Sequence, residues 1–432
     1  MEASAKRARA ADGSAPDRLS ALPDDLRRRV LSFLPSRQSV QTTVLSKRWV
    51  DLWRSVPAIN LDFLEFGDFG EEIVGSRKMN NFTSELLMLH NTECLDMFRL
   101  HIPPFINYRR LLDVDRWIRH GIKYRPLVLE ISVIRDFWHQ FHIPCLGSAF
   151  YRLKKLDLFG LSLDHCFTER LNSRCPVLED LVLEDCRNQF AGIQSDTLKN
   201  LVVDNCVSDV ADVLVIRAPC LASLRLELPY YFYKNGLSLV AGNSFVTASI
   251  SVIGCEFGLS HKGQAFLVGS LFNVTNLTLK GFDAMAFLDK ESDNFPTFDN
   301  LRTLSLTLCL LSEHDEQKFK ALGRFLQKSP NLEKLTVQDF WYSEGTRKVR
   351  EYAQPLLETV KPVVGPIEFP MLENLRTLFL DKCDLRDNFM ILRHLLQSSP
   401  NLENLTVWCC ELPEGPAEGK GPKTWFAANA TS

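Results

Sequence analysis

The 432-residue sequence predicts an α/β protein in which a small module of short helices precedes a long curved solenoid of parallel strands with outer helices. Three observations predict this architecture. Apolar residues recur with helical spacing between residues 22 and 56, the pattern L-x-x-L-x-L recurs from residue 95 onward, and segments 301–337 and 375–407 share one plan. Length alone favours about three domains, but an internal repeat lets one domain occupy most of the chain.

The composition is that of a folded protein without a strong charge bias. Apolar residues make up 45% and charged residues 24%, and 50 Lys and Arg against 53 Asp and Glu leave a net charge of −3. We therefore expect neither nucleic acid nor an anionic membrane as a partner. The first residues lack the apolar core of a signal peptide, and no run of about 18 apolar residues predicts a membrane span. The sequence therefore predicts a protein of the cytoplasm or nucleus whose 12 cysteines are reduced.

The chain is expected to begin with a disordered tail over residues 1–16, which are rich in Ala, Ser and charge. The first helix is predicted to begin at Asp24, whose side chain can cap it, and to end before Pro35. A second short helix is expected over 39–45. Apolar residues at i, i+4, i+7 and i+8 place one face of the first helix together: Leu26, Val30, Phe33 and Leu34.

A third short helix is predicted after Ser46, which can cap it. Its apolar face is formed by residues at i, i+3, i+4 and i+7, namely Trp49, Leu52, Trp53 and Val56. About forty residues are too few to bury a core alone. The module therefore either caps the structure that follows or presents spare apolar surface to a partner.

Several elements of this module occur in a recognisable order. They are Leu22-Pro23-Asp24-Asp25-Leu26, then Val30-Leu31-Ser32-Phe33-Leu34-Pro35, then Thr43-Val44-Leu45-Ser46-Lys47-Arg48-Trp49, followed by Leu52-Trp53. Residues 17–57 closely resemble an F-box, in the form common in plant F-box/leucine-rich-repeat proteins. The resemblance implies that this segment binds Skp1 and so joins a Skp1–cullin–F-box (SCF) ubiquitin ligase.

The resemblance also implies which side chains contact Skp1. Carried over position by position, the residues that face Skp1 are Leu22, Pro23, Leu26, Val30, Leu31 and Leu34. A second group is divided between that interface and the internal core of the module: Val44, Leu45, Trp49 and Trp53. For any single leucine, plain helix packing remains the alternative explanation.

The repeat that follows is expected to occupy residues 95–412, after a connection and a first repeat helix over 58–94, with the helix near 82–89. Successive units start at intervals that mostly match the 20–29 residues of a leucine-rich repeat. Each L-x-L is a short strand with its leucines inward. The turn position, three residues after the second leucine, favours a small residue. The unit starts are residues 95, 124, 153, 178, 198, 221, 247, 274, 301, 332, 375 and 402.

Six of the cysteines recur at that turn position, which explains half of the cysteine content: Cys186, Cys206, Cys255, Cys309, Cys383 and Cys410. Outer helices are predicted most clearly over 313–327 and 385–397, each followed by Ser-Pro-Asn-Leu-Glu. Residues 341–370 are interpreted as an insertion with a helix near 346–360, and residues 413–432 as a disordered tail. Many relatives of the resembled family continue into a further C-terminal domain, before which this chain is expected to stop.

No catalytic, metal or cofactor site is predicted. The sequence contains no H-E-x-x-H, G-x-S-x-G or G-x-x-x-x-G-K-[ST] motif, and it lacks the paired C-x-x-C elements that a structural zinc site favours. Such an adaptor requires no chemistry of its own, because it lowers the entropic cost of bringing a lysine and an activated ubiquitin together.

The concave face of the solenoid is the expected site for a protein substrate. The residue after the second inward position of each strand forms a row: Phe159, Glu184, Asp204, Glu227, Ile253, Lys280, Thr307, Gln338, Asp381 and Trp408. Glu184, Asp204 and Glu227 are consecutive and predict a negative stripe, because parallel strands lie about 4.8 Å apart. We expect these acids to prefer a basic segment of the substrate, with Trp408 and Phe379 as an apolar anchor. An ordinary solvated charged face is the alternative.

The sequence thus predicts a substrate-recognition adaptor of an SCF-type ubiquitin ligase, with a Skp1-like protein, and through it cullin, as partners. Two other functions remain open. One is a scaffold that uses Skp1 for stability without degrading a target. The other is a receptor in which a small molecule binds together with the target, as in some plant relatives of the resembled family. Lys280 is the sole cation of the concave row, so a site for an anionic small molecule is not indicated.

Overall fold

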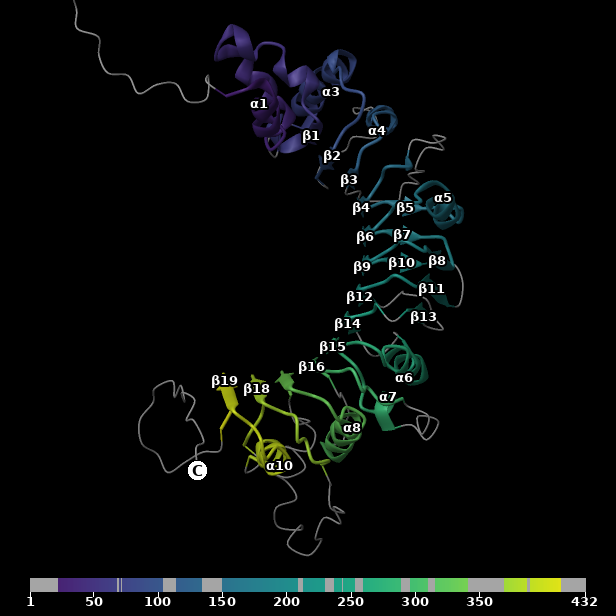
Figure 1. Cartoon of the computed structure of the whole chain (residues 1–432), viewed down its shortest axis with the longest axis vertical. Helices are drawn as coiled ribbons and strands as arrows, with labels where there is room; N and C mark the ends of the chain where they lie inside the picture. Colours follow the sequence, from purple (N-terminus) through teal and green to yellow (C-terminus); the bar gives the residue numbers. More distant parts are fainter. Residues whose placement is uncertain are drawn as a thin grey trace, which may run out of the picture.

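The computed structural model forms an open arc, with strands lining its concave side and helices on its convex side (Figure 1). The structure describes residues 22–67, 70, 72–103, 114–133, 150–208, 213–229, 237–242, 244–252, 259–288, 296–309, 315–340, 369–386 and 389–412. Five predictions lie outside these residues: the tails over 1–16 and 413–432, the helix near 346–360, the turn position of Cys255 and the place of Ile253 in the concave row.

The amino-terminal module, as far as the structure describes it from residue 22, contains two short α-helices and three single turns of 3₁₀ helix. They are α1 (Asp24–Leu31), α2 (Ser36–Gln41), η1 (Thr42–Val44), η2 (Lys47–Trp49) and η3 (Leu52–Ser55). The prediction that Asp24 caps the first helix is wrong: Pro23 is the N-cap residue, and Asp24 is the first helical residue. There its carboxylate still lies in the first turn, where negative charge is favourable.

The prediction of one continuous third helix is wrong, because two separate 3₁₀ turns, η2 and η3, occupy its place. Trp49 lies in the small core of the module, whereas Trp53 lies in the large core of the solenoid. A straight helix would point residues four apart to the same side. Separate 3₁₀ turns let the two tryptophans pack into different cores.

The parallel sheet begins earlier than the predicted boundary at residue 95. Strand β1 (Ala58–Asp62) pairs with β2 (Met97–Ile102), so residues 58–62 are the first strand rather than a connection. After η4 (Phe63–Glu65), helix α3 spans Glu72–Leu89 and is longer than the predicted helix near 82–89. The amino-terminal module therefore leads directly into the solenoid.

Among the described residues, thirteen strands form one sheet, in which each strand pairs in parallel with the next. This confirms the predicted solenoid with a parallel concave sheet. After β1 and β2 the strands are β3 (Val128–Val133), β4 (Lys155–Phe159), β6 (Asp180–Glu184), β9 (Asn200–Asp204), β12 (Ser223–Leu228), β14 (Thr247–Val252), β15 (Asn276–Lys280), β16 (Thr303–Thr307), β17 (Lys334–Gln338), β18 (Thr377–Asp381) and β19 (Asn404–Trp408).

Helices cover much of the convex side: α4 (Val114–Lys123), α5 (Phe167–Arg174), α6 (His261–Gly269), α7 (Met285–Leu288), α8 (Asp315–Gln327) and α10 (Met390–Ser398). Helices α8 and α10 confirm the predicted outer helices, although α10 begins later than residue 385. Two small parallel sheets lie behind the concave sheet, in the part of the arc that begins beside α5 and ends before α6 (Figure 1). Their strands are β5 (Ser162–Leu163), β7 (Arg187–Asn188) and β10 (Val207–Ser208), and β8 (Gly192–Gln194), β11 (Leu214–Ala218) and β13 (Leu237–Ala241).

The predicted strand register is wrong by two residues in two repeat units, those that start at residues 124 and 247. In β14, Ala248 and Ile250 are the inward partners of Leu224 and Leu226, so Ser251 occupies the place in the concave row that was predicted for Ile253. Ile253 itself lies outside the described residues. In β3 the first inward residue is Leu129, which pairs with Phe98, so this unit starts after Tyr124. Both errors arise because alternation repeats every two residues, so a shift of two preserves the pattern.

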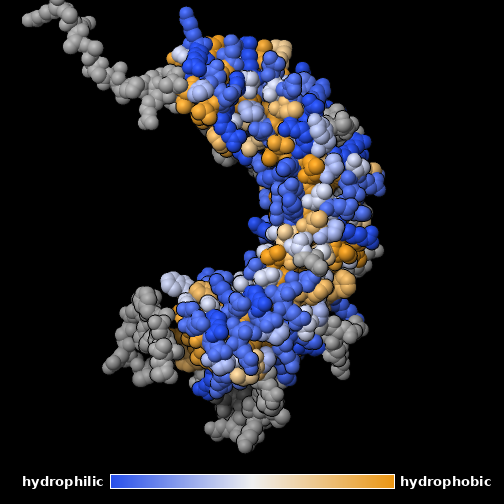
Figure 2. All heavy atoms as spheres, viewed as in Figure 1, coloured by the Kyte–Doolittle hydropathy of each residue, from blue (hydrophilic) through white to orange (hydrophobic). Residues whose placement is uncertain are grey.

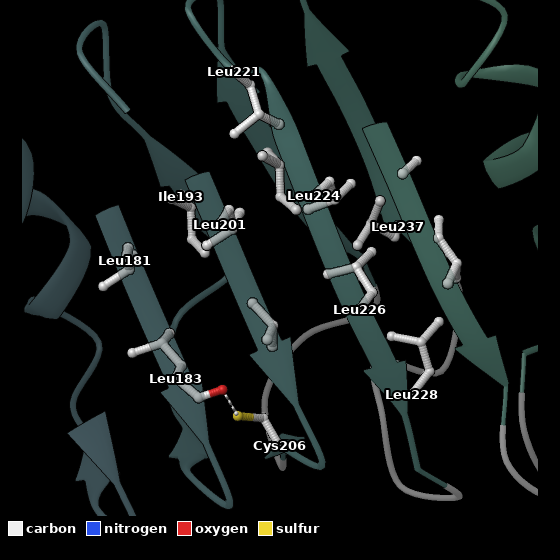
Figure 3. Close-up of a cluster of buried hydrophobic side chains, with 14 of the residues drawn as sticks. Leu181, Leu183, Ile193, Leu201, Cys206, Leu221, Leu224, Leu226, Leu228 and Leu237 are labelled. Atoms are coloured by element: carbon white, nitrogen blue, oxygen red, sulfur yellow. Dashed lines mark hydrogen bonds between the residues drawn. The ribbon is translucent and has the colours of Figure 1, made fainter. Parts of the chain in front are cut away.

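Inward residues of neighbouring strands form a continuous core. Figure 3 shows Leu181, Leu201 and Leu224 of β6, β9 and β12 together with Ile193 and Leu237 of the small convex sheet. These side chains are at most 2% exposed. Burial of leucine after leucine, at about 1.5–3 kcal/mol each, is the main stabilising term of such a stack.

Where a cysteine occupies the turn position, one hydrogen bond recurs. The Cys206 thiol donates to the Leu183 carbonyl of the preceding strand at 3.4 Å (Figure 3), and the thiols of Cys186 and Cys309 bond equivalent carbonyls. The residue before the turn position is in the left-handed region at Gly160, Asp185, Asn205, Gly281, Leu308, Asp339, Lys382 and Cys409. Cys409, which had no assigned place in the repeat, thus belongs to the same turn.

Candidate functional site

Helix α1 directs an apolar face outward. Leu26 and Val30 of α1 and Phe33 in the turn directly after it, at i, i+4 and i+7, are 52%, 42% and 73% exposed. The opposite face carries Arg27 and Leu31, which are 0% and 1% exposed. In a protein that used α1 only for its own core, the apolar stripe would face inward. An outward stripe is instead typical of a surface that a partner covers.

The segment after α2 adds further exposed apolar side chains. Val44 at the end of η1 is 85% exposed, and Leu45 beside it is 62% exposed. Figure 2 shows hydrophobic (orange) residues on the surface of this amino-terminal part of the molecule. We refer to Leu26, Val30, Phe33, Val44 and Leu45 as the apolar docking residues.

Arg27 holds the inner face of α1 in place. Its guanidinium lies over the Trp49 ring, 5.1 Å from the ring centroid, and 3.8 Å from the Asp24 carboxylate. Arg48 bonds the same carboxylate at 3.0 Å, which ties the segment after η1 to the start of α1. A buried guanidinium is stable only with such partners, so Arg27 fixes which face of the helix points outward.

The structure separates the ten residues predicted to contact Skp1. Pro23, Leu26, Val30, Val44 and Leu45 are exposed, and Leu22 and Leu34 are half-buried. Leu31, Trp49 and Trp53 are buried, so the internal core is their place in this fold. Phe33 was not among the predicted contacts, although its spacing from Leu26 and Val30 already put it on their face. Val50, which is 44% exposed, was not predicted either.

The module is joined firmly to the solenoid. Trp53 packs into the solenoid core. The backbone N–H of Asn91 donates to the Arg54 carbonyl at 2.7 Å, and that of Asp96 donates to the Pro57 carbonyl at 2.7 Å. The Asn60 N–H donates to Ser36 Oγ at 2.8 Å. The docking residues therefore have a fixed direction relative to the concave sheet.

The acidic row on the concave face is present. Glu184 of β6, Asp204 of β9 and Glu227 of β12 are consecutive partners in the sheet, and we call them the acidic row. Burial, followed by repulsion from Asp157 and Asp204, raises the pKa of Glu184. Burial and the neighbouring Asp204 raise the pKa of Glu227. The acids thus disfavour one another's charge, as like charges at close range do.

Cations near the acidic row neutralise some of its carboxylates more than others. The Arg225 guanidinium bonds Asp204 at 2.8 Å. Lys280 lies two strands beyond Glu227, with Ser251 between them, and offsets only part of the rise in the pKa of Glu227. On the amino-terminal side, Lys155 bonds Asp157 at 3.0 Å. Within the described part of the chain, none of these three cations forms an ion pair with Glu184 or Glu227, so these two are the carboxylates best placed for a basic ligand.

The predicted apolar anchor is only partly accessible. Trp408 of β19 is 52% exposed and lies beside Asp381, whereas Phe379 of β18 is half-buried on the same face. Six strand spacings separate β12 from β19. At about 4.8 Å per strand the acidic row and Trp408 lie roughly 29 Å apart, a distance that about nine extended residues span.

The described part of the chain contains no cluster of three or more His, Cys, Asp or Glu side chains that could hold a metal ion. In the same residues, no helix combines the length and the apolar character that a membrane crossing needs. The arrangement offers two surfaces for protein partners: the apolar docking residues and the concave face.

Comparison with known proteins gives two matching family models. One, described as an F-box domain, matches residues 19–59. The other, described as the LRR repeats of FBD-associated F-box protein At5g56370, matches residues 127–238. The first match spans the amino-terminal module, and the second spans strands β3 to β12 together with the small convex sheets up to the start of β13.

Relatives of similar length are known from two plants. The chain is 33% identical over 380 residues to MEIOTIC F-BOX protein MOF of Oryza sativa subsp. japonica, which covers 80% of this chain and 76% of that protein. It is 26% identical over 441 residues to F-box/LRR-repeat protein At4g14096 of Arabidopsis thaliana, covering 91% and 88% of the two chains. It is 30% identical over 339 residues to the putative FBD-associated F-box protein At5g56440 of the same plant, covering 68% and 70%.

Proposed function

Because the chain belongs to the plant F-box/leucine-rich-repeat family, we propose that it is the substrate-recognition adaptor of an SCF-type ubiquitin ligase, active in the cytoplasm or nucleus. Its F-box binds a Skp1-like protein, and through it cullin, and its solenoid binds a protein substrate. The observation that carries the proposal is the outward apolar face that Leu26 and Val30 of α1 form together with Phe33, which follows the helix.

The adaptor works by position rather than by chemistry. The hydrogen bonds from Asn91 and Asp96 and the buried Trp53 hold the F-box on the solenoid. A substrate on the concave face is thus held at a defined place relative to the ligase. Such pre-positioning lowers the entropic cost of bringing a substrate lysine to an activated ubiquitin, and it requires no catalytic residue in this chain.

The F-box proposal is tested by replacing Leu22, Pro23 and Leu26 together with alanine. We expect this variant to lose capture of a purified Skp1-like protein, while circular dichroism shows an unchanged solenoid. The matched control is Phe266→Ala on the convex helix α6, where the ring is 62% exposed. Undiminished capture by the triple variant would refute the assignment.

The substrate proposal places a basic segment against the acidic row, with an apolar side chain near Trp408. It is supported by the raised pKa values of Glu184 and Glu227, which arise first from burial and then from repulsion by neighbouring acids, because a bound cation relieves that repulsion. Proximity labelling by the full chain identifies the proteins that it holds. Reversal of all three acids to lysine is expected to remove basic partners from that set.

A control with the same change in charge uses three exposed acids outside the acidic row: Asp299, Glu373 and Glu403. If both triple reversals alter labelling equally, long-range charge rather than the acidic row governs binding. Recovery of the chain with a Skp1-like protein but never with cullin would instead favour a non-degradative scaffold. Dependence of substrate capture on an added small molecule would favour a co-receptor.

A further inference from the structure

Two pairs of turn cysteines occupy equivalent places on neighbouring strands. Cys186 and Cys206 follow β6 and β9, and Cys383 and Cys410 follow β18 and β19. Neighbouring parallel strands lie about 4.8 Å apart, within the Cα separation of 4.4–6.8 Å that a disulfide needs. The repeat therefore juxtaposes two thiols wherever consecutive units both place cysteine at the turn.

The two residues of the carboxy-terminal pair are in direct contact. The backbone N–H of Cys383 donates to Cys410 Sγ at 3.3 Å. The Cys383 thiol donates to the Val337 carbonyl at 3.4 Å, and the Cys410 thiol to the Leu380 carbonyl at 3.6 Å. Each sulfur thus points toward the strand before its own, and Cys410 points toward the turn that contains Cys383.

The two pairs differ in access to solvent. Cys186, Cys206 and Cys383 are all 0% exposed, whereas Cys410 is half-buried. The difference follows from position in the sheet. Further strands cover the turns after β6 and β9, but β19 is the last strand of the sheet within the described residues, and its own inward residues are only half-buried.

We propose that Cys383 and Cys410 form a peroxide-sensitive thiol pair that closes to a disulfide. The Cys410 thiolate attacks hydrogen peroxide, forms an S–O bond, breaks the O–O bond and yields a sulfenic acid and water once the leaving hydroxide is protonated. The Cys383 sulfur then attacks the Cys410 sulfur, loses its proton and releases the second water. Two thiols are oxidised, and one peroxide is reduced to two waters.

The local electrostatics support Cys410 as the thiol that reacts first. The hydrogen bond from Cys383 lowers the pKa of Cys410 to about 7, although burial and the Asp381 carboxylate oppose this. The bond to Cys410 and burial raise the pKa of Cys383. Nearby, the carboxylates of Asp384 and Glu411 are both bonded by Arg386. In the other pair, Cys186 and Cys206, burial raises the pKa of Cys206. A thiolate is the reactive form of cysteine.

The disulfide would join the turns after the last two described strands. The chain between Cys383 and Cys410 contains α10 and β19, including the exposed Trp408. Oxidation would therefore tie the end of the concave face to the strand before it. Reduction would leave β19 held by hydrogen bonds to β18 along a single edge.

The test is limited oxidation of the full-length reduced chain with hydrogen peroxide, followed by alkylation and peptide mass spectrometry. We expect loss of two free thiols and a linked Cys383–Cys410 peptide, with Cys186 and Cys206 still alkylated. In Cys383→Ser, dimedone should label Cys410 and the linked peptide should be absent. Hydrogen exchange of β19 is expected to slow on oxidation of the wild-type chain and to stay unchanged in Cys383→Ser.

Three results would overturn the proposal. The first is a linked Cys409–Cys410 peptide in place of Cys383–Cys410. The second is equal oxidation of the Cys186–Cys206 pair, which would show that burial does not distinguish the two pairs. The third is accumulation of Cys410 sulfinic acid in the wild-type chain without a linked peptide, which would show that Cys383 does not reach the oxidised sulfur.

Discussion

Replacing Leu26, Val30 and Phe33 with alanine is expected to weaken binding of the Skp1-like partner at least about 30-fold while leaving the stability of the chain almost unchanged. The three side chains are 52%, 42% and 73% exposed. Full burial of such a side chain is worth about 1.5–3 kcal/mol. Covering only these exposed fractions therefore supplies about 2–4 kcal/mol beyond what alanine retains, or about 30- to 1000-fold in Kd.

The measurement is isothermal titration of the purified chain with the Skp1-like protein, paired with denaturant unfolding of the chain alone. Leu31→Ala is the contrasting variant, since Leu31 lies on the same helix but is 1% exposed. It is expected to cost about 2–5 kcal/mol of stability. If the triple variant loses stability as much as Leu31→Ala, or binds as tightly as the wild type, the outward face of α1 is not the docking surface.

Three further predictions follow from the solenoid and the start of its sheet. Reversing the charge of the whole acidic row is expected to abolish binding of basic substrate segments, and unchanged labelling of partners would contradict the hypothesis. Burial lowers the pKa of His90 to about 4. The stability that the neutral imidazole gives the folded chain is therefore complete above pH 6.5 and falls, by at most about 3 kcal/mol, between pH 6.5 and 4. His90→Gln should remove this pH dependence from unfolding midpoints measured against pH. Gly281→Ala should destabilise the chain by at least about 1–3 kcal/mol in thermal unfolding. Gly281 has a φ of +75°, and a Cβ there would lie 2.0 Å from the Val252 carbonyl oxygen. The control Gly269→Ala, in a helix, should be neutral or stabilising in the same experiment.

The strongly patterned parts of the chain were predictable because their determinants are local. The apolar residues of β6, β9, β16 and β18 alternate clearly, and the structure buries them as predicted. The loosely patterned units were misplaced by two residues, as in β14, where Ser251 takes the predicted place of Ile253. Alternation alone leaves such a shift undetermined; pairing with Glu227 on β12 sets the register.

The cysteines show the same division. Their recurrence at the turn position could be recognised from spacing, and the thiol of Cys206 makes the expected kind of bond to a backbone carbonyl. Spacing could not distinguish the buried pair Cys186 and Cys206 from the pair Cys383 and Cys410. Exposure of Cys410 depends on how many strands follow it in the sheet, which is a property of the stack.

By itself the sequence determined the F-box motif, the repeat and its parallel strands, because each depends on residues a few positions apart. Only the tertiary structure decided which face of α1 is free. Helical periodicity places Leu26, Val30 and Phe33 on one side, but it gives the same signal whether that side meets the chain's own core or a partner. Packing of Arg27 against Trp49 and burial of Leu31 settle the choice, since a helix can direct only one face to its core.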